Sequence, residues 1–116
     1  MFNHINRRIA SLRELIKGGL YQENLDKIVS ECNALAQDTS HVLTFFVLKQ
    51  VFAEMSAVLE GEAVVVEQHK DLISDITGSA ILILGKVEND EPIEFTDLEA
   101  LVRIHLRNVN IFRADR

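Results

Sequence analysis

Histidine is the residue type in this 116-residue chain with the clearest capacity for metal chemistry. His41, His69 and His105 fall in stretches predicted to be helical, and imidazoles that converge inside a bundle can bind zinc. None of the histidines has a glutamate three residues before it, so the Glu-x-x-His pairs of di-metal carboxylate bundles are absent from the sequence. We therefore interpret these histidines as partly buried positions of the helix seams and predict neither a metal nor a cofactor.

Nucleophilic catalysis finds equally little support in the sequence. Cys32, the only cysteine, stands among apolar residues at helical spacing, which indicates a core position rather than a reactive thiol. The sequence contains no Gly-x-Ser-x-Gly motif, no phosphate-binding glycine loop and no His-Glu-x-x-His motif. We predict that the chain is not an enzyme and has no catalytic residues.

Acidic residues dominate the middle of the chain. The net charge is −6, and residues 21–95 carry four lysines against fourteen aspartates and glutamates. Such a surface steers a basic protein toward it. The predicted partner-binding residues are Glu60, Glu62, Glu67, Asp71, Asp75, Glu88, Asp90 and Glu91. The alternative interpretation is that basic terminal helices neutralise this segment, within the chain or across a dimer.

These features predict a non-enzymatic protein-binding module. We expect a small acidic regulatory or neutralising protein, of the inhibitor, immunity or anti-factor kind. The expected partners are another protein, with a basic one favoured by the charge, and a second copy of the chain in a homodimer.

Basic residues of the first predicted helix support a different hypothesis, a nucleic-acid-binding regulator. Arg7, Arg8, Arg13 and Lys17 could contact phosphates. No aromatic side chains are interleaved with them, and the acidic middle of the chain repels nucleic acid. We therefore predict that nucleic acid is not the partner.

One further alternative comes from a resemblance to histidine phosphotransfer domains. The chain length, the bundle pattern and the segment Thr77-Gly78-Ser79 resemble that family, which implies a phosphotransfer-like helical bundle. Ser74 stands where the family has its phosphorylated histidine.

A second resemblance concerns the first two predicted helices. The residues Arg7-Arg8-Ile9, Gly19 and Tyr21 are similar to the first hairpin of the copper-sensing, DNA-binding repressors, which implies a metal-binding helical bundle. Gln22 stands where that family has a cysteine ligand.

The long apolar-rich stretch from Ser40 to Val87 must position most of these residues. Read in sevens from His41, eleven of its fourteen a and d positions are apolar, which is typical of packed helices. One straight helix of this length would reach about 70 Å, whereas a compact domain of this size has a radius of gyration of about 13 Å. We predict that the stretch breaks near Gly61 and folds back.

Amphipathic segments on either side complete the fold. Gly18-Gly19 ends the first, because glycine accepts the left-handed conformation that follows many helices. Thr96 and Glu99 have the spacing of a capping box, which predicts the start of the last helix. We predict an all-α, antiparallel bundle of four to five helices at about 4–17, 21–37, 40–60, 62–87 and 97–113.

Two apolar runs leave an α+β alternative open. Residues 63–67 and 80–84 are β-friendly, and each run follows a glycine closely, so they could form short buried strands. We favour helices because the heptad seam continues through both runs without a change of phase.

Length and composition bound the remaining properties. The length fits one helical domain, residues 1–116, and the single proline suits helices. The longest wholly apolar run is five residues, too short for a membrane span, and the N-terminus has no secretory pattern. Since a lone cysteine is typical of reducing compartments, we expect a cytoplasmic protein that does not enter membranes.

Overall fold

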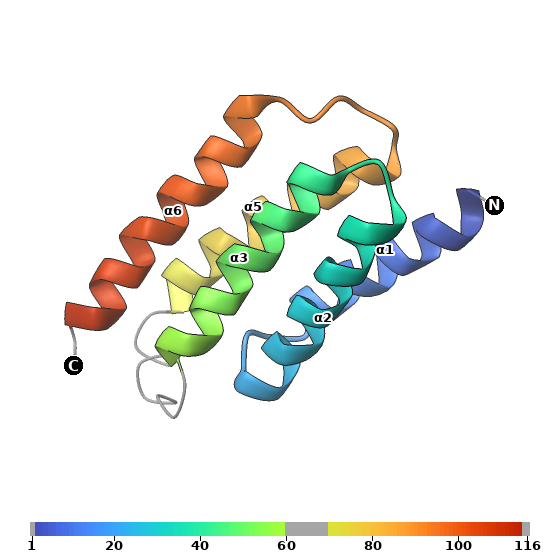
Figure 1. Ribbon diagram of the computed structural model, residues 1–116. Helices are drawn as coiled ribbons and strands as arrows, with labels where there is room; N and C mark the ends of the chain where they lie inside the picture. The colour runs from blue at the N-terminus through green and yellow to red at the C-terminus, as the bar shows by residue number, and fades with distance from the viewer. Residues whose placement is uncertain (1, 60–69, 115–116) are drawn as a thin grey trace.

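The computed structural model describes residues 2–59 and 70–114, and this part of the chain forms five helices and no strand (Figure 1). The helices are α1 (Phe2–Lys17), α2 (Gln22–Asp38), α3 (Val42–Leu59), α5 (Lys70–Glu88) and α6 (Phe95–Ala114). The predicted all-α fold is confirmed, and the described helix ends agree with the predicted ones to within two residues, except that α5 begins at Lys70 where the prediction has 62. Gly61, residues 62–69 of the predicted fourth helix and the alternative strand at 63–67 lie outside the described residues.

The alternative strand at 80–84 is wrong, because this run lies inside α5. Ala80, Ile83 and Leu84 are buried, whereas Leu82 is 61% exposed. Burial at intervals of three and four residues is the pattern of a helix with one face on the core. The apolar run therefore reflects one buried face and one exposed leucine.

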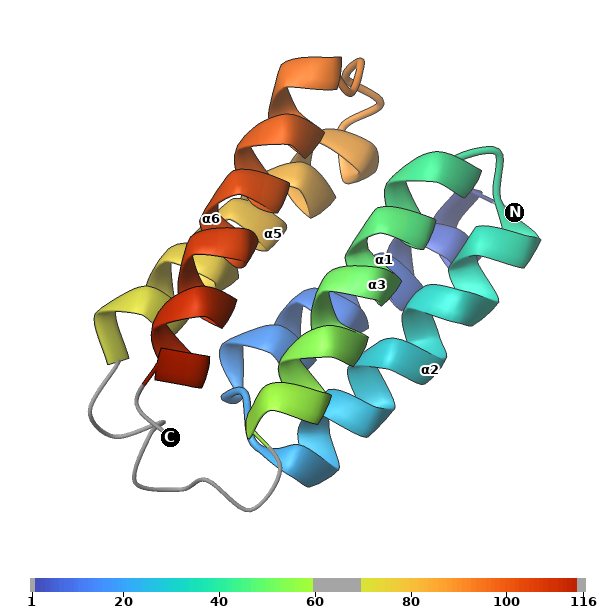
Figure 2. The same cartoon turned by 60° about the vertical axis from the view of Figure 1, so that its left-hand side comes forward.

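The five helices pack in two layers (Figures 1 and 2). Helices α6, α3 and α2 lie side by side in one layer, and α5 and α1 form the other. Neighbouring helices run antiparallel, except that α3 and α6 run in the same direction. A closed ring of five helices cannot alternate throughout, so one parallel pair is unavoidable. The radius of gyration is 13.7 Å, so the long apolar stretch does fold back.

The core lies between the two layers and draws on every described helix. The heptad seam predicted from His41 is confirmed where the structure describes it. Its fully buried members are Phe45, Leu48, Phe52 and Met55 on α3 and Ile76, Ala80 and Ile83 on α5. This seam supplies several of the largest buried side chains, including two phenylalanines, and so packs α3 and α5 into the common core.

The turn between α1 and α2 holds the end of α1 as the sequence predicts. Gly19 has a φ of +117°, which glycine adopts without strain. The buried side chain of Asn24 donates from Nδ2 to the carbonyl oxygens of Leu15 at 2.5 Å and Gly19 at 2.7 Å. Two carbonyls near the end of α1 are thereby satisfied inside the protein.

The start of α6 is capped two residues earlier than predicted. The backbone N–H of Glu94 donates to Oδ2 of Asp97 at 2.9 Å, so the capping pair is Glu94 and Asp97. Lys86 at the end of α5 donates to the same oxygen at 2.8 Å. The predicted box at Thr96 and Glu99 is wrong, because α6 already begins at Phe95 and Thr96 therefore lies inside the helix.

Candidate protein-docking surface

Helix α3 is apolar on nearly all sides, which distinguishes it from the amphipathic α1 and α2. Only Lys49 and Glu54 among its 18 residues are charged. Its inner face fills the core, yet Leu43 is 62% exposed and Phe46 is 49% exposed on the outer face. A helix that is hydrophobic all round is normally buried all round. The outer face of α3 is therefore an uncovered apolar surface in the isolated chain.

The outer residues of α3 repeat at intervals of three and four. We call them the outer stripe: Leu43, Phe46, Gln50, Ala53 and Ala57. Leu43, Phe46, Gln50 and Ala57 are exposed, and Ala53 is half-buried. Helix α3 therefore carries two seams of heptad spacing, one in the core and one facing outward.

A groove of about 570 Å³ runs beside the outer stripe, between the parallel helices α3 and α6. Phe46, Val47 and Ala57 line its α3 side, and Val102 lines its α6 side. Leu106, one turn after Val102 on α6, is a further large apolar side chain that is 53% exposed, and it does not line the groove. The groove extends the apolar surface from one helix to two.

A single polar pair lies in this groove. Nε2 of His105 on α6 lies 2.6 Å from Oε1 of Glu54 on α3. The His105 side chain is 6% exposed and the Glu54 side chain is 42% exposed. The histidine is therefore part of the wall, while the carboxylate reaches the surface and can also accept hydrogen bonds from outside.

The acidic residues predicted to bind a partner do not form one surface. The described members lie at opposite ends of α5, which are about 25 Å apart for a span of 17 residues. Asp71 and Asp75 lie near its start. Glu88 is its last residue, and Asp90 and Glu91 follow it. Glu60, Glu62 and Glu67 lie outside the described residues.

Three of the described acidic residues have structural roles within the chain. The carboxylate of Glu88 bonds to Nη1 of Arg13 on α1. Oδ2 of Asp75 lies 3.1 Å from Nη2 of Arg107 on α6. Asp90 has a φ of +56° and is the left-handed residue that ends α5. Asp71 and Glu91 are exposed and keep their charge at the surface.

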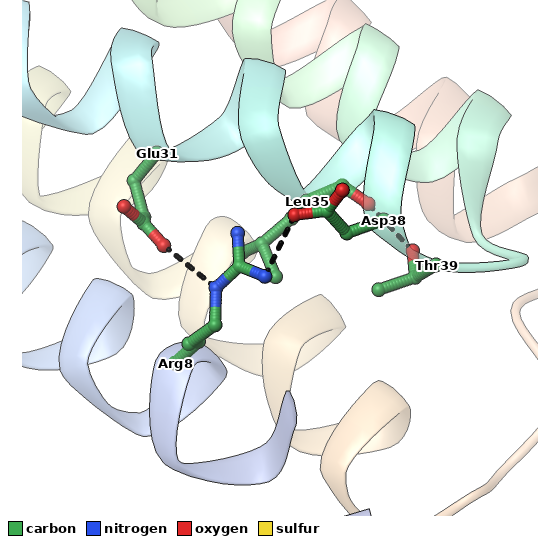
Figure 3. A network of polar contacts seen from close by, with 5 residues as sticks. All are labelled: Arg8, Glu31, Leu35, Asp38 and Thr39. Carbon is green, nitrogen blue, oxygen red and sulfur yellow. Dashed lines mark hydrogen bonds and ion pairs between the residues drawn. The ribbon is translucent and has the colours of Figure 1, made fainter. Parts of the chain in front are cut away.

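Arg8 makes a similar link between α1 and α2 (Figure 3). Its Nη1 donates to Oδ2 of Asp38 at 2.9 Å and its Nε to Oε1 of Glu31 at 3.2 Å. The bond to Asp38, aided by Glu31 and opposed by desolvation, raises the pKa of Arg8. The Thr39 hydroxyl in the same network donates to the Leu35 carbonyl at 2.7 Å and closes α2. The interpretation that basic terminal helices neutralise the acidic middle within the chain is thus confirmed for these contacts.

The basic side chains of α1 are therefore largely engaged inside the protein. Arg8 and Arg13 bind carboxylates of other helices, and Lys17 lies 3.8 Å from Glu14 on its own helix. Arg7 is exposed. This leaves a small positive surface for phosphates, which are bound by several cations acting together.

The predicted histidines do not converge where the structure describes them. His41 immediately precedes α3, whereas His105 binds Glu54, about 20 Å further along the same helix. His69 lies outside the described residues. Within residues 2–59 and 70–114, no group of three histidine, cysteine or acidic side chains is placed to hold a metal ion.

Cys32 is a core residue, as predicted. Its side chain is fully buried on α2, and burial, with a smaller contribution from Glu31, raises the pKa of its thiol to about 12. The thiolate, which is the reactive form, is thereby suppressed at neutral pH.

Comparisons with protein-family models, curated proteins and solved structures found no match to this chain. The resemblances to phosphotransfer domains and copper-sensing repressors therefore stay predictions. None of the helices described is long and apolar enough to cross a membrane. The outer stripe of α3 is the most distinctive feature of the described surface.

The sequence predictions did not include the outer stripe, although its signal was present. Only two charged residues fall between Val42 and Leu59, far fewer than on an ordinary surface helix. The heptad seam that starts at His41 contains only the inner positions of α3. Leu43, Phe46 and Gln50 repeat at the same spacing in a second frame, on the outer face.

Proposed function

We propose that this chain is a non-enzymatic protein-binding module that docks a helix with apolar residues at intervals of three and four on the outer stripe of α3 and the adjoining groove. The observation that carries the proposal is the exposure of Leu43 and Phe46 on a helix whose inner face already fills the core. Monomeric proteins rarely expose a large contiguous apolar patch unless it binds something.

The shape and chemistry of the groove support a helical occupant. A docked helix presents apolar anchors at intervals of three and four residues, which match an outer stripe of the same spacing. Its anchors would pack against Phe46, Val47 and Val102. The exposed carboxylate of Glu54 would accept a hydrogen bond from the occupant and so fix its position along the groove.

The charge of the chain supports a regulatory or neutralising role. At a net charge of −6 the chain attracts basic proteins over a distance of about 10 Å at ordinary ionic strength. Exposed acidic residues such as Asp71 and Glu91 lie outside the stripe and would contribute to this attraction. The free thiol of Cys32 fits a reducing compartment such as the cytoplasm.

Two leucines of equal exposure allow a matched test. Leu43 lies on the outer stripe and is 62% exposed, and Leu82 lies on α5 and is 61% exposed. The tagged wild type, Leu43→Glu and Leu82→Glu are compared as baits in an extract of the native cells, with quantitative mass spectrometry. We expect Leu43→Glu to lose proteins that Leu82→Glu retains. Equal sets of bound proteins for the two variants would contradict the proposed surface.

A further inference from the structure

We infer that the helix docked on the outer stripe is α3 of a second copy of this chain, so that two chains form a dimer with their α3 helices side by side and parallel. This inference rests on the proposed docking surface and names its occupant. A two-fold interface requires a patch that is complementary to itself. A stripe of heptad spacing meets this requirement, because it packs against an identical stripe as in a coiled coil.

Two charged residues flank the outer stripe on opposite sides. Glu54 lies on the α6 side, since it bonds to His105. Lys49 lies on the α2 side, since Ser56, seven residues further on, accepts a hydrogen bond from Gln22 of α2 at 2.5 Å. A two-fold axis parallel to the helices places the α2 side of one α3 against the α6 side of the other.

This arrangement pairs the two flanking charges. In a parallel pair of heptad helices, the g position of one helix lies near the e position five residues further along its neighbour. With Gln50 and Ala53 as a and d, Lys49 is a g position and Glu54 is the e position five residues on. Lys49 therefore meets the partner's Glu54, and the two-fold axis repeats the contact. Lys49 makes no ion pair with any other residue in the described part of the chain, so its ammonium group is available.

Gln50 favours the parallel arrangement over the antiparallel one. In a parallel pair in register, Gln50 faces the partner's Gln50 across the axis, and each amide can donate to the other. An antiparallel pair would place this amide against the partner's Ala53, which offers no side-chain hydrogen bond. A polar residue at a single a position is a known device for fixing the register of such pairs.

The available area is sufficient for a stable dimer. The layer of α6, α3 and α2 is three helices wide, and α3 has 18 residues. At about 10 Å per helix and about 1.5 Å per residue, the whole three-helix face has a projected area of roughly 800 Å² per chain, which the two-fold axis uses in full when α2 and α6 pack against the partner's α6 and α2. That is about the area that each partner contributes to an interface of standard size.

The test reverses the two charges separately and then mixes the variants. Lys49→Glu places two glutamates opposite each other in its own dimer, and Glu54→Lys places two lysines there. Each is expected to raise the dimer dissociation constant at least about tenfold, because two attractive contacts become repulsive. An equimolar mixture of the two variants restores both opposite-charge contacts. Lys17→Glu on α1, in the other layer, makes the same charge change as the control.

Light scattering of the purified full chain across a dilution series gives the result. The wild type and Lys17→Glu are expected at twice the chain mass of 13.1 kDa. Each single reversal shifts to the monomer, and the mixture returns to the dimer, which also shows that both variants are folded. A monomeric wild type, or a mixture no more dimeric than its components, would overturn the inference. A monomer that still loses captured proteins through Leu43→Glu would leave the proposed docking surface standing.

Discussion

Glu54 of α3 and His105 of α6 are joined across the docking groove, with Oε1 lying 2.6 Å from Nε2. Because an ionised carboxylate only accepts hydrogen bonds, Nε2 is the donor and carries the proton. Nδ1 of the same ring is buried and has no hydrogen-bond partner among the described residues. The pair links the two parallel helices α3 and α6 across the groove.

Removing the His105 ring should destabilise the bundle. We expect His105→Ala to lower the free energy of unfolding by about 2–4 kcal/mol, since it opens a cavity and removes the donor to Glu54. His105→Gln should lose less, because its amide can donate to the same carboxylate. Urea unfolding measures both. A loss no larger than that of His41→Ala, at a partly exposed position, would contradict this role.

Gly78 should be a site of easy stabilisation. It lies inside α5, and a Cβ added there would meet nothing within 4 Å. Gly78→Ala is therefore expected to raise the free energy of unfolding by about 0.5–1 kcal/mol. Gly19→Ala is the matched contrast, because its φ of +117° strains any other residue. Thermal unfolding should show a higher midpoint for the first variant and a lower one for the second; changes of the same sign would contradict this explanation.

The ion pair of Asp97 and Lys86 should make stability fall in acid. The bond from Lys86, with that from the Glu94 N–H, holds the pKa of Asp97 below its ordinary value of 3.8. A carboxyl whose pKa is lower in the folded state stabilises the fold fully above its unfolded pKa, and this stability is lost as the pH falls through the folded pKa. Asp97→Ala should lower the melting temperature at pH 7, and the difference should shrink as the pH falls below about 4 and disappear only below the lowered pKa of folded Asp97. A difference that stays constant across this range would contradict the pairing.

Cys32 should resist thiol reagents in the folded protein. Its thiol is buried and its pKa is raised to about 12, so little thiolate forms at neutral pH. We expect a chromogenic disulfide to react with no thiol in the native chain and with one after denaturation. Reaction of the native chain at the rate of a free thiol would show that α2 opens readily.

Helix positions could be predicted from the sequence because the core seam is regular. The residues from Phe45 to Met55 repeat at heptad spacing and are all buried where predicted. The residues that cap α6 could not be predicted. Two carboxylates, Asp97 and Glu99, each stand three residues after a possible first residue of a capping box, Glu94 and Thr96. Lys86, which is distant in sequence, decides between them by binding Asp97.

The candidate site was harder to predict than the fold. Sequence reasoning treats the acidic middle as one surface, but α5 separates Asp71 from Glu91 by its whole length. The sequence also overstates how many acidic side chains are free to bind a partner. Arg13 and Arg107, from the two ends of the chain, form ion pairs with Glu88 and Asp75. Exposure is a tertiary property, so the outer stripe becomes a candidate only once the inner seam has been placed.

A cysteine on the outer stripe tests the central claim most directly. In the proposed dimer Gln50 lies opposite the partner's Gln50, so Gln50→Cys should form an intermolecular disulfide under mild oxidation. Because the native Cys32 is buried, it should not interfere. Leu82→Cys on α5 is the exposed control. Non-reducing electrophoresis is predicted to show a cross-linked dimer for Gln50→Cys alone; a monomer for Gln50→Cys, or equal cross-linking of both variants, would contradict the parallel dimer formed through α3.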